Sequence, residues 1–121
     1  MLHMMEGEWS VLQVDSAIDC TQLYKLAKSR RLVPQEIPIE SVSYKPLSNI
    51  KPSSGRYIAA RVSQPSVVCL GMTNPHSKPY RMLDGRHRLL KRVNGGYTSV
   101  LSYVLQVEDV IKFIQPISNN H

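Results

Sequence analysis

The stretch from residue 80 to residue 105 constrains the fold more than any other part of the chain. Residues 80–83 are typical of a strand, and Asp84-Gly85 turns the chain into a helix. That helix ends at Asn94-Gly95-Gly96, residues that favour a left-handed cap, and residues 97–105 form another expected strand. A strand, a helix and a strand in close succession need a sheet against which the helix can bury its apolar side. The stretch therefore predicts a small α/β or α+β domain.

Other segments extend this sheet. Strands are expected at residues 9–14, 35–42 and 66–72. Pro38 lies in the second of them and favours an edge position, because proline has no backbone N–H to donate to a neighbouring strand. The run Val67-Val68-Cys69-Leu70 favours a strand that is covered on both faces. These signals predict a mixed sheet of about four strands with flanking helices.

Further helices are expected to cover the sheet. They lie at residues 16–31, 55–62 and 107–114. The last of them is expected to bury the apolar residues at helical spacing, which are Val107, Val110, Ile111 and Ile114.

The length of 121 residues fits a single domain. We divide it into an N-terminal arm and helix, residues 1–33, and a domain proper, residues 34–121, which together form one compact unit. Cys20 and Cys69 are isolated in segments that look buried, so reduced core thiols are expected. No apolar run approaches the roughly 20 residues that span a bilayer. The N-terminus also lacks the pattern of a signal peptide, so we expect a cytoplasmic location and no membrane partner.

The charges at the start of the middle helix run against the usual rule. The helix opens with Arg86, His87 and Arg88, although a helix N-terminus already carries about half a positive charge and unpaired N–H groups. The helices expected at residues 16–31 and 107–114 start with acidic residues instead. Cations at a helix N-terminus are unfavourable unless an anion lies among them, as in phosphate sites. The alternative is that the three side chains extend into water, where each mismatch costs on the order of a few tenths of a kcal/mol.

The overall charge favours acidic partners. The formal net charge of +6 and the pI near 9.6 are typical of proteins that bind nucleotides, nucleic acids or anionic surfaces. Binding of DNA or RNA without catalysis is therefore an alternative function. The basic residues that we expect on such a surface are Lys28, Arg30, Arg31, Arg61, Lys91 and Arg92.

The motif Asp84-Gly85-Arg86-His87-Arg88, between a short strand and a helix that ends in two glycines, resembles the signature of the ParB/sulfiredoxin superfamily. Members carry a glycine followed by a basic pair in the same strand-turn-helix setting. Ile37-Pro38-Ile39-Glu40-Ser41-Val42 is similar to the family's first strand, and Pro65-Ser66-Val67-Val68 to the strand that enters its second half. The resemblance covers residues 34–114 and implies a stand-alone ParB-like domain.

The resemblance also implies a ligand. In this superfamily the N-terminus of the motif's helix holds the phosphates of a nucleotide. Gly85 would then let the backbone approach the ligand, while Arg86, His87 and Arg88 would surround its phosphate oxygens. Gly55-Arg56 resembles the arginine-bearing phosphate loop of the CTP-binding branch. ATP or CTP is the expected nucleotide, with Mg²⁺ as the expected counter-ion.

Departures from the family pattern bear on the chemistry. Sulfiredoxins need a cysteine where this chain has Arg86, so the chain is not expected to reduce sulfinic acids. Turnover, if it occurs, would be phosphoryl transfer or the phosphodiester hydrolysis of ParB-like nucleases, with Glu40 or Asp84 as candidate catalytic residues. Asp84 has the alternative role of a helix cap.

Two further expectations concern partners and metals. Small domains of this type also occur in phages and mobile elements, which makes an accessory role towards a host protein a third option. The sequence leaves the oligomeric state open. We expect no metal site in the protein itself, because ligand spacing is lacking at His3, His76 and His121.

Overall fold

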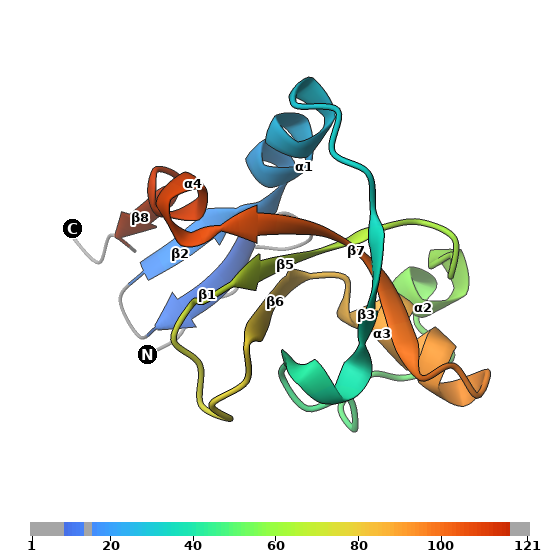
Figure 1. Ribbon diagram of the computed structural model, residues 1–121. Helices are drawn as coiled ribbons and strands as arrows, with labels where there is room; N and C mark the ends of the chain where they lie inside the picture. Colours follow the sequence, from blue (N-terminus) through green and yellow to red (C-terminus); the bar gives the residue numbers. More distant parts are fainter. Residues whose placement is uncertain (1–8, 14–15, 117–121) are drawn as a thin grey trace.

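The computed structural model describes residues 9–13 and 16–116 and shows a mixed α/β fold, as predicted (Figure 1). A five-stranded mixed sheet has the order β3-β7-β5-β6-β4. Its strands are β3 (Gln35–Pro38), β4 (Val42–Ser43), β5 (Ser66–Leu70), β6 (Tyr80–Asp84) and β7 (Ser99–Gln106). A separate antiparallel sheet consists of β1 (Trp9–Gln13), β2 (Ser16–Asp19) and β8 (Ile114–Pro116). The described part of the chain thus contains more strands than the four or so expected.

The helices are short. They are α1 (Cys20–Ser29), α2 (Gly55–Ala59), α3 (Arg86–Asn94) and α4 (Val107–Ile111), with a 3₁₀ turn η1 (Ile39–Ser41). Among the described residues, no helix has both the length and the apolar character needed to cross a membrane.

Strand β5 forms the centre of the larger sheet. It pairs in parallel with β7 and antiparallel with β6, and its residues Val67, Val68 and Cys69 are fully buried, as the apolar run predicted. The register pairs Val67 with Asp84. The start of β5 therefore lies beside the end of β6, where the basic motif begins.

The segment expected to be one strand at residues 35–42 is divided. Strand β3 ends at Pro38 and lies at one edge of the sheet, as the proline predicted. The chain then makes the turn η1, and β4 pairs in parallel with β6 at the opposite edge. One predicted strand thus supplies residues of both edges; the N–H of Ile39 still donates to the carbonyl oxygen of Thr98 at 3.0 Å before the chain turns away from β7.

The two ends of the described chain also differ from expectation. The helix expected from residue 16 begins at Cys20, because β2 first pairs with β1 and β8. Similarly, α4 ends at Ile111 and β8 follows it. The predicted burial of Val110 is confirmed, whereas the side chain of Ile111 is 56% exposed. The predicted helical burial of Ile114 is wrong because this residue lies in a strand and pairs with β2.

Two apolar clusters lie on the two faces of the larger sheet. One joins Leu23 of α1 to Val67 of β5 and to Leu105 of β7. The other joins Leu89 of α3 to Val68, the next residue of β5. Since successive side chains of a strand point to opposite faces, α1 and α3 pack on opposite sides of β5. In Figure 1, α1 lies at one end of the molecule while α2 and α3 lie together at another.

The two cysteines are part of this core. Both Cys20 and Cys69 are buried and free, which confirms the prediction of core thiols. Burial is the main cause that raises the pKa of the Cys69 thiol to about 11, so the group is protonated near neutral pH.

Candidate functional site

The turn between β6 and α3 is built around Gly85. Its φ of 116° lies in the left-handed region, where a side chain is strained. A Cβ placed on Gly85 would overlap the side chain of Ser66 and lie 3.2 Å from its Cα. The turn is therefore pressed against the first residue of β5. Glycine is needed here both for its backbone conformation and for this close approach.

Asp84 does not cap the helix, which corrects one of the roles predicted for it. The N-cap residue is Gly85, and no side chain makes a capping hydrogen bond. Asp84 ends β6, and its Oδ2 accepts a hydrogen bond of 2.7 Å from the hydroxyl of Tyr24 on α1. The first N–H groups of α3, which have no intrahelical partner, are thus left without a side-chain cap.

Arg88 contributes to the same network. Its Nη1 donates to the Tyr24 hydroxyl at 2.8 Å and to the carbonyl oxygen of Pro65 at 3.0 Å, and it lies 4.0 Å from the Asp84 carboxylate. The guanidinium carbon also lies 5.8 Å from the centre of the Tyr24 ring. Arg88 therefore links α3 to α1 and to the segment before β5. These contacts give Arg88 a structural role, in addition to any contact with a ligand.

A buried hydroxyl lies against the helix end. The side chain of Ser66 is fully buried, and its Oγ has no hydrogen-bond partner among the described residues. Such a group costs about 1–3 kcal/mol unless a partner satisfies it. Oγ is the Ser66 atom nearest to the Cβ position of Gly85, so the hydroxyl points towards the N-cap.

Arg86 spans the start of the helix. Its Nη1 donates to the carbonyl oxygen of Pro46 at 2.7 Å and to Oδ1 of Asn49 at 2.9 Å. These two residues belong to the loop between β4 and α2, so the arginine holds that loop beside the turn. Burial lowers the pKa of Arg86, which indicates that its charge is partly removed from water.

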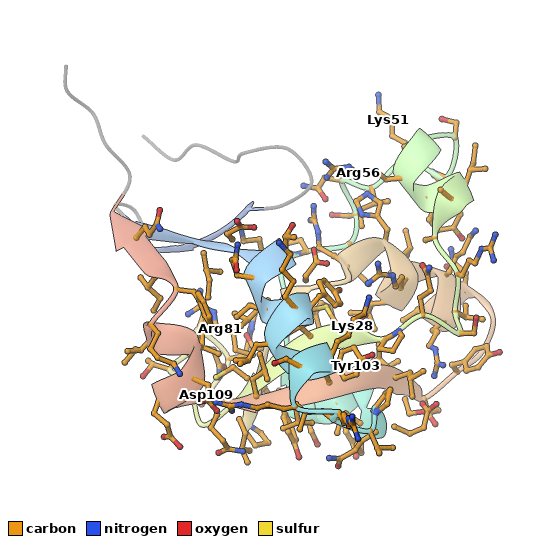
Figure 2. The ribbon with its side chains drawn as sticks, turned by 90° about the horizontal axis from the view of Figure 1, so that it is seen from above. Lys28, Lys51, Arg56, Arg81, Tyr103 and Asp109 are labelled. Atoms are coloured by element: carbon orange, nitrogen blue, oxygen red, sulfur yellow. The ribbon has the colours of Figure 1, made fainter. Side chains whose placement is uncertain are left out.

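The pKa of His87 reflects the charge of a residue of α2. Burial lowers the pKa of its imidazole first, and the positive charges of Arg86 and Arg56 lower it further. Arg56 belongs to α2, and Figure 2 shows it at the same end of the molecule as Lys51 of the preceding loop. The charge of Arg56 thus acts on His87 of the motif, and a role of Arg56 at the phosphate site stays a prediction.

Lys45 is a further cation near the turn, which the sequence reasoning missed. Burial lowers the pKa of Lys45, and the charges of Arg86 and Arg81 add to this effect. Ser43 of β4 pairs with Arg81 of β6, and the parallel course of the two strands carries Lys45 towards the end of β6. No local signal identifies this pairing, because β4 has two residues only. The guanidinium of Arg81 itself donates to the carbonyl oxygen of Thr73 at 2.8 Å, in the loop before β6, and Figure 2 shows it well away from Arg56. We call the group at the turn the basic cluster; its members are Lys45, Arg56, Arg86 and His87.

Two residues of the expected nucleic-acid surface, both on α3, have contacts within the protein. Arg92 is 5% exposed, and its guanidinium bonds to Glu36 at 2.7 Å and to the carbonyl oxygen of Val62. Lys91 donates to the carbonyl oxygens of Ile58 and Ala60 at 3.0 and 2.8 Å. These contacts hold α3 to β3 and to the end of α2. Buried in this way, Arg92 is not offered to a phosphate backbone, and we leave it out of that surface.

The remaining basic residues are spread over the molecule. Arg30 forms an ion pair of 2.7 Å with Asp109 of α4, which Figure 2 shows on the other side of the molecule from Lys51. The residues that are exposed and remain predicted contacts of nucleic acid are Lys28, Arg31 and Arg61.

Glu40 is not among the side chains gathered at the turn. It is exposed in η1, and Val42, two residues later, pairs with Tyr80 at the start of β6, whereas Gly85 follows the end of that strand. Among the described residues, Asp84 is the acidic group that acts on the pKa of His87. The geometry therefore does not group Glu40 with the motif.

Metal ligands are not clustered in the part of the chain that the structure describes. No group of three or more His, Cys, Asp and Glu side chains there is placed to hold a metal ion. His76 shares a hydrogen bond of 2.7 Å with the Ser43 hydroxyl, which ties its loop to β4. His3 and His121 lie outside the described residues.

Comparisons with known proteins add no relative. No protein-family model, no curated protein and no solved structure matches this chain. The similarity to the ParB/sulfiredoxin superfamily accordingly rests on the motif residues and stays a prediction.

Proposed function

We propose that this chain binds a nucleotide or another phosphate-bearing ligand at the turn between β6 and α3. The observation that carries the proposal is the basic cluster, which gathers at the uncapped N-terminus of α3. Its members come from the loop after β4, from α2 and from α3. Like charges held together are unfavourable, and a bound anion would turn this repulsion into attraction.

The donor groups suit phosphate in particular. Guanidinium groups match the oxygens of phosphate, and the free N–H groups of a helix start point at a bound anion. Arg56 and Arg86 supply the guanidinium groups, and α3 supplies the helix start. The resemblance to the ParB/sulfiredoxin superfamily supports ATP or CTP as the ligand.

The proposal is one of binding rather than of a defined reaction. Asp84, the acidic residue of the motif, accepts a hydrogen bond from Tyr24, and Glu40 is not grouped with the turn. Mg²⁺ would therefore be held mainly by the phosphates of its nucleotide, as is usual for this ion. Phosphoryl transfer or hydrolysis would depend on groups that a second substrate or water brings to the site.

The test is a calorimetric titration of ATP and of CTP, with Mg²⁺, into the wild type and two charge-matched variants. Arg56→Ala removes one member of the basic cluster and should weaken binding about tenfold, the value of one charge-assisted contact. Lys78→Ala removes an exposed charge in the turn before β6, at the far end of that strand, and should leave the affinity unchanged. Equal affinities for the two variants would overturn the proposal.

Two additional measurements separate the alternatives. Release of inorganic phosphate from the same nucleotides reports turnover. Binding of duplex DNA, followed over a range of salt concentrations, reports the nucleic-acid alternative, because phosphate-backbone contacts weaken steeply as salt rises. Strong, salt-dependent DNA binding that Arg56→Ala leaves unchanged would favour that alternative over the nucleotide site.

A further inference from the structure

The segment between β4 and β5 buries little apolar surface. Within the part of the chain that the structure describes, residues 46–60 pair with no strand, and α2 lies in their second half. Ile50 is 8% exposed, and Leu47 packs against the apolar cluster around Leu89. The other side chains of the segment are exposed or half-buried. Apolar burial therefore holds the first half of the segment and leaves α2 to other contacts.

A side chain of α3 also holds the first half. Arg86 donates from Nη1 to the carbonyl oxygen of Pro46 at 2.7 Å and to Oδ1 of Asn49 at 2.9 Å. Asn49 is exposed and directly precedes Ile50. The arginine therefore fixes the chain next to its buried apolar residue.

Two more side chains of α3 hold the second half, which lies beside α3 (Figure 1). Lys91 donates from Nζ to the carbonyl oxygens of Ile58 and Ala60 at 3.0 and 2.8 Å, and this nitrogen lies 5.2 Å from the centre of the Tyr57 ring. The Tyr57 hydroxyl accepts a hydrogen bond of 3.0 Å from Asn94. No residue of α2 is buried. These polar contacts, rather than a buried apolar face, hold α2 to α3.

Backbone hydrogen bonds connect the two halves. The amide of Ile50 donates to Leu47 at 3.1 Å, and that of Ser54 donates to Lys51 at 2.9 Å. The carbonyl oxygen of Ser54 then accepts from the amide of Ile58 at 3.0 Å, while its hydroxyl caps α2. Successive turns thus lead from the first half directly into α2. A movement of one half is therefore passed to the other.

The chain that follows α2 is fixed more firmly. Arg92, which is 5% exposed, donates from Nε and Nη2 to the carbonyl oxygen of Val62 at 3.0 and 2.7 Å. Arg88 donates to the carbonyl oxygen of Pro65 at 3.0 Å. These contacts stay in place when those of Lys91 are broken, so the chain can pivot just after Ala60.

We infer that residues 46–60 form a strap, which opens as a single unit while the sheet and α3 remain folded. Segments with little buried apolar surface open at a lower free-energy cost than the core. Opening carries Arg56 of α2 away from Arg86 and His87, so the basic cluster is assembled only while the strap is closed. The inference goes beyond the proposed function and does not depend on it, because the opening is a property of the free protein.

Amide hydrogen exchange, followed by NMR in the full-length chain without ligand, tests the inference. The amides of Ile50, Ile58 and Ala60 are hydrogen-bonded inside the strap and report on its two halves. Those of Val68 and Cys69 report on β5 at the centre of the sheet. Under conditions where exchange reflects the opening equilibrium, the strap amides should exchange at least about tenfold faster than those of β5, after correction for intrinsic rates.

Two variants weaken the two halves separately. Asn49→Ala removes the oxygen that accepts from Arg86, and Lys91→Met removes the donor to α2 but keeps an apolar stem. Each variant should speed exchange in both halves of the strap by about fivefold, the value of one hydrogen bond, and leave β5 unchanged. Lys25→Met is the matched control, because Lys25 is exposed on α1, and should change none of these rates.

Three outcomes would overturn the inference. If each variant speeds exchange only in the half that it touches, the strap does not open as a unit. If β5 is accelerated as much as the strap, the strap opens only when the whole protein unfolds. If neither variant speeds exchange, the contacts with α3 do not hold the strap closed. Failure of ATP and CTP to bind would remove the proposed function and would leave these rates as they are.

Discussion

Gly85 is required for two separate reasons, its backbone conformation and its close approach to Ser66. Its backbone has a φ of 116°, and its α-carbon lies where any side chain would meet Ser66. Gly96, at the other end of α3, also has a positive φ of 83°, but a Cβ there would meet open space. The pair therefore separates the cost of backbone strain from the cost of a steric clash.

Gly85→Ala should lower the free energy of unfolding by about 3 kcal/mol or more, because strain and overpacking add. Gly96→Ala should cost only about 1 kcal/mol, the strain alone. Urea denaturation of both variants measures the difference. Adding Ser66→Gly to Gly85→Ala should recover part of the loss; a double variant with no recovery would contradict the clash with Ser66.

The helices are held in place by polar contacts between elements as well as by the core. Tyr24 of α1 lies between Asp84 of β6 and Arg88 of α3, and burial raises the pKa of its hydroxyl. Arg92 of α3 in turn bonds to Glu36 of β3. Tyr24, Arg88 and Arg92 thus link the motif and its helix to the neighbouring elements through hydrogen bonds within the protein.

Tyr24→Phe should lower stability by about 1–2 kcal/mol, because it leaves Asp84 and Arg88 without their shared hydroxyl while the ring still packs edge-on against Tyr103. Thermal and urea unfolding measure the change. Tyr97→Phe, whose residue is 45% exposed, is the control and should be nearly neutral. Similar losses of stability in both variants would show that the hydrogen bonds of the Tyr24 hydroxyl do not stabilise the fold.

Arg92→Ala should destabilise the protein by about 2–4 kcal/mol, because it leaves the carbonyl oxygens of Val62 and Ser99 without their donor inside the fold. Glu36→Gln removes the charge of the partner but leaves a hydrogen-bonding side chain at a half-exposed position, and should cost less than about 1 kcal/mol. Chemical denaturation of the two variants gives the comparison. A larger loss of stability in Glu36→Gln than in Arg92→Ala would contradict the view that the buried carbonyl oxygens, rather than the ion pair, account for the effect of Arg92.

For the whole molecule, stability should fall as the solution becomes acidic. Hydrogen bonds from Ser99 and Arg92 lower the pKa of Glu36, and a hydrogen bond from Arg30 lowers that of Asp109. Carboxylates with lowered pKa values stabilise the fold above their unfolded values of about 4, and this contribution is lost as pH falls through the folded pKa values.

The measurement is the midpoint of urea unfolding as a function of pH. Glu36→Gln combined with Asp109→Asn should flatten the curve below about pH 4.5. The lowered pKa of His87 acts in the same direction from its ordinary value of 6.5 downwards, and His87→Gln should remove that earlier part. Curves that run parallel for wild type and variants would contradict these assignments.

The sequence by itself determined the elements whose signals are local. The apolar run of β5, the turn at Gly85 and the helix end before Gly96 were all predicted, because period, side-chain size and backbone freedom act within a few residues. Pro38 likewise predicted an edge strand. The basic start of α3 could also be predicted from the sequence, because its three residues are consecutive and lie within one helical turn.

Only the tertiary structure decided what surrounds that helix start. Strands β2 and β8 are short and pair with each other across most of the chain, so periodicity did not predict them, nor did it predict that residues 35–42 would be divided between β3 and β4. The pairing of β4 with β6 brings Lys45 towards the motif, and packing turns Asp84 towards Tyr24 rather than into the helix cap. Local preferences determine what a segment can become, whereas pairing and burial between distant segments determine which side chains meet.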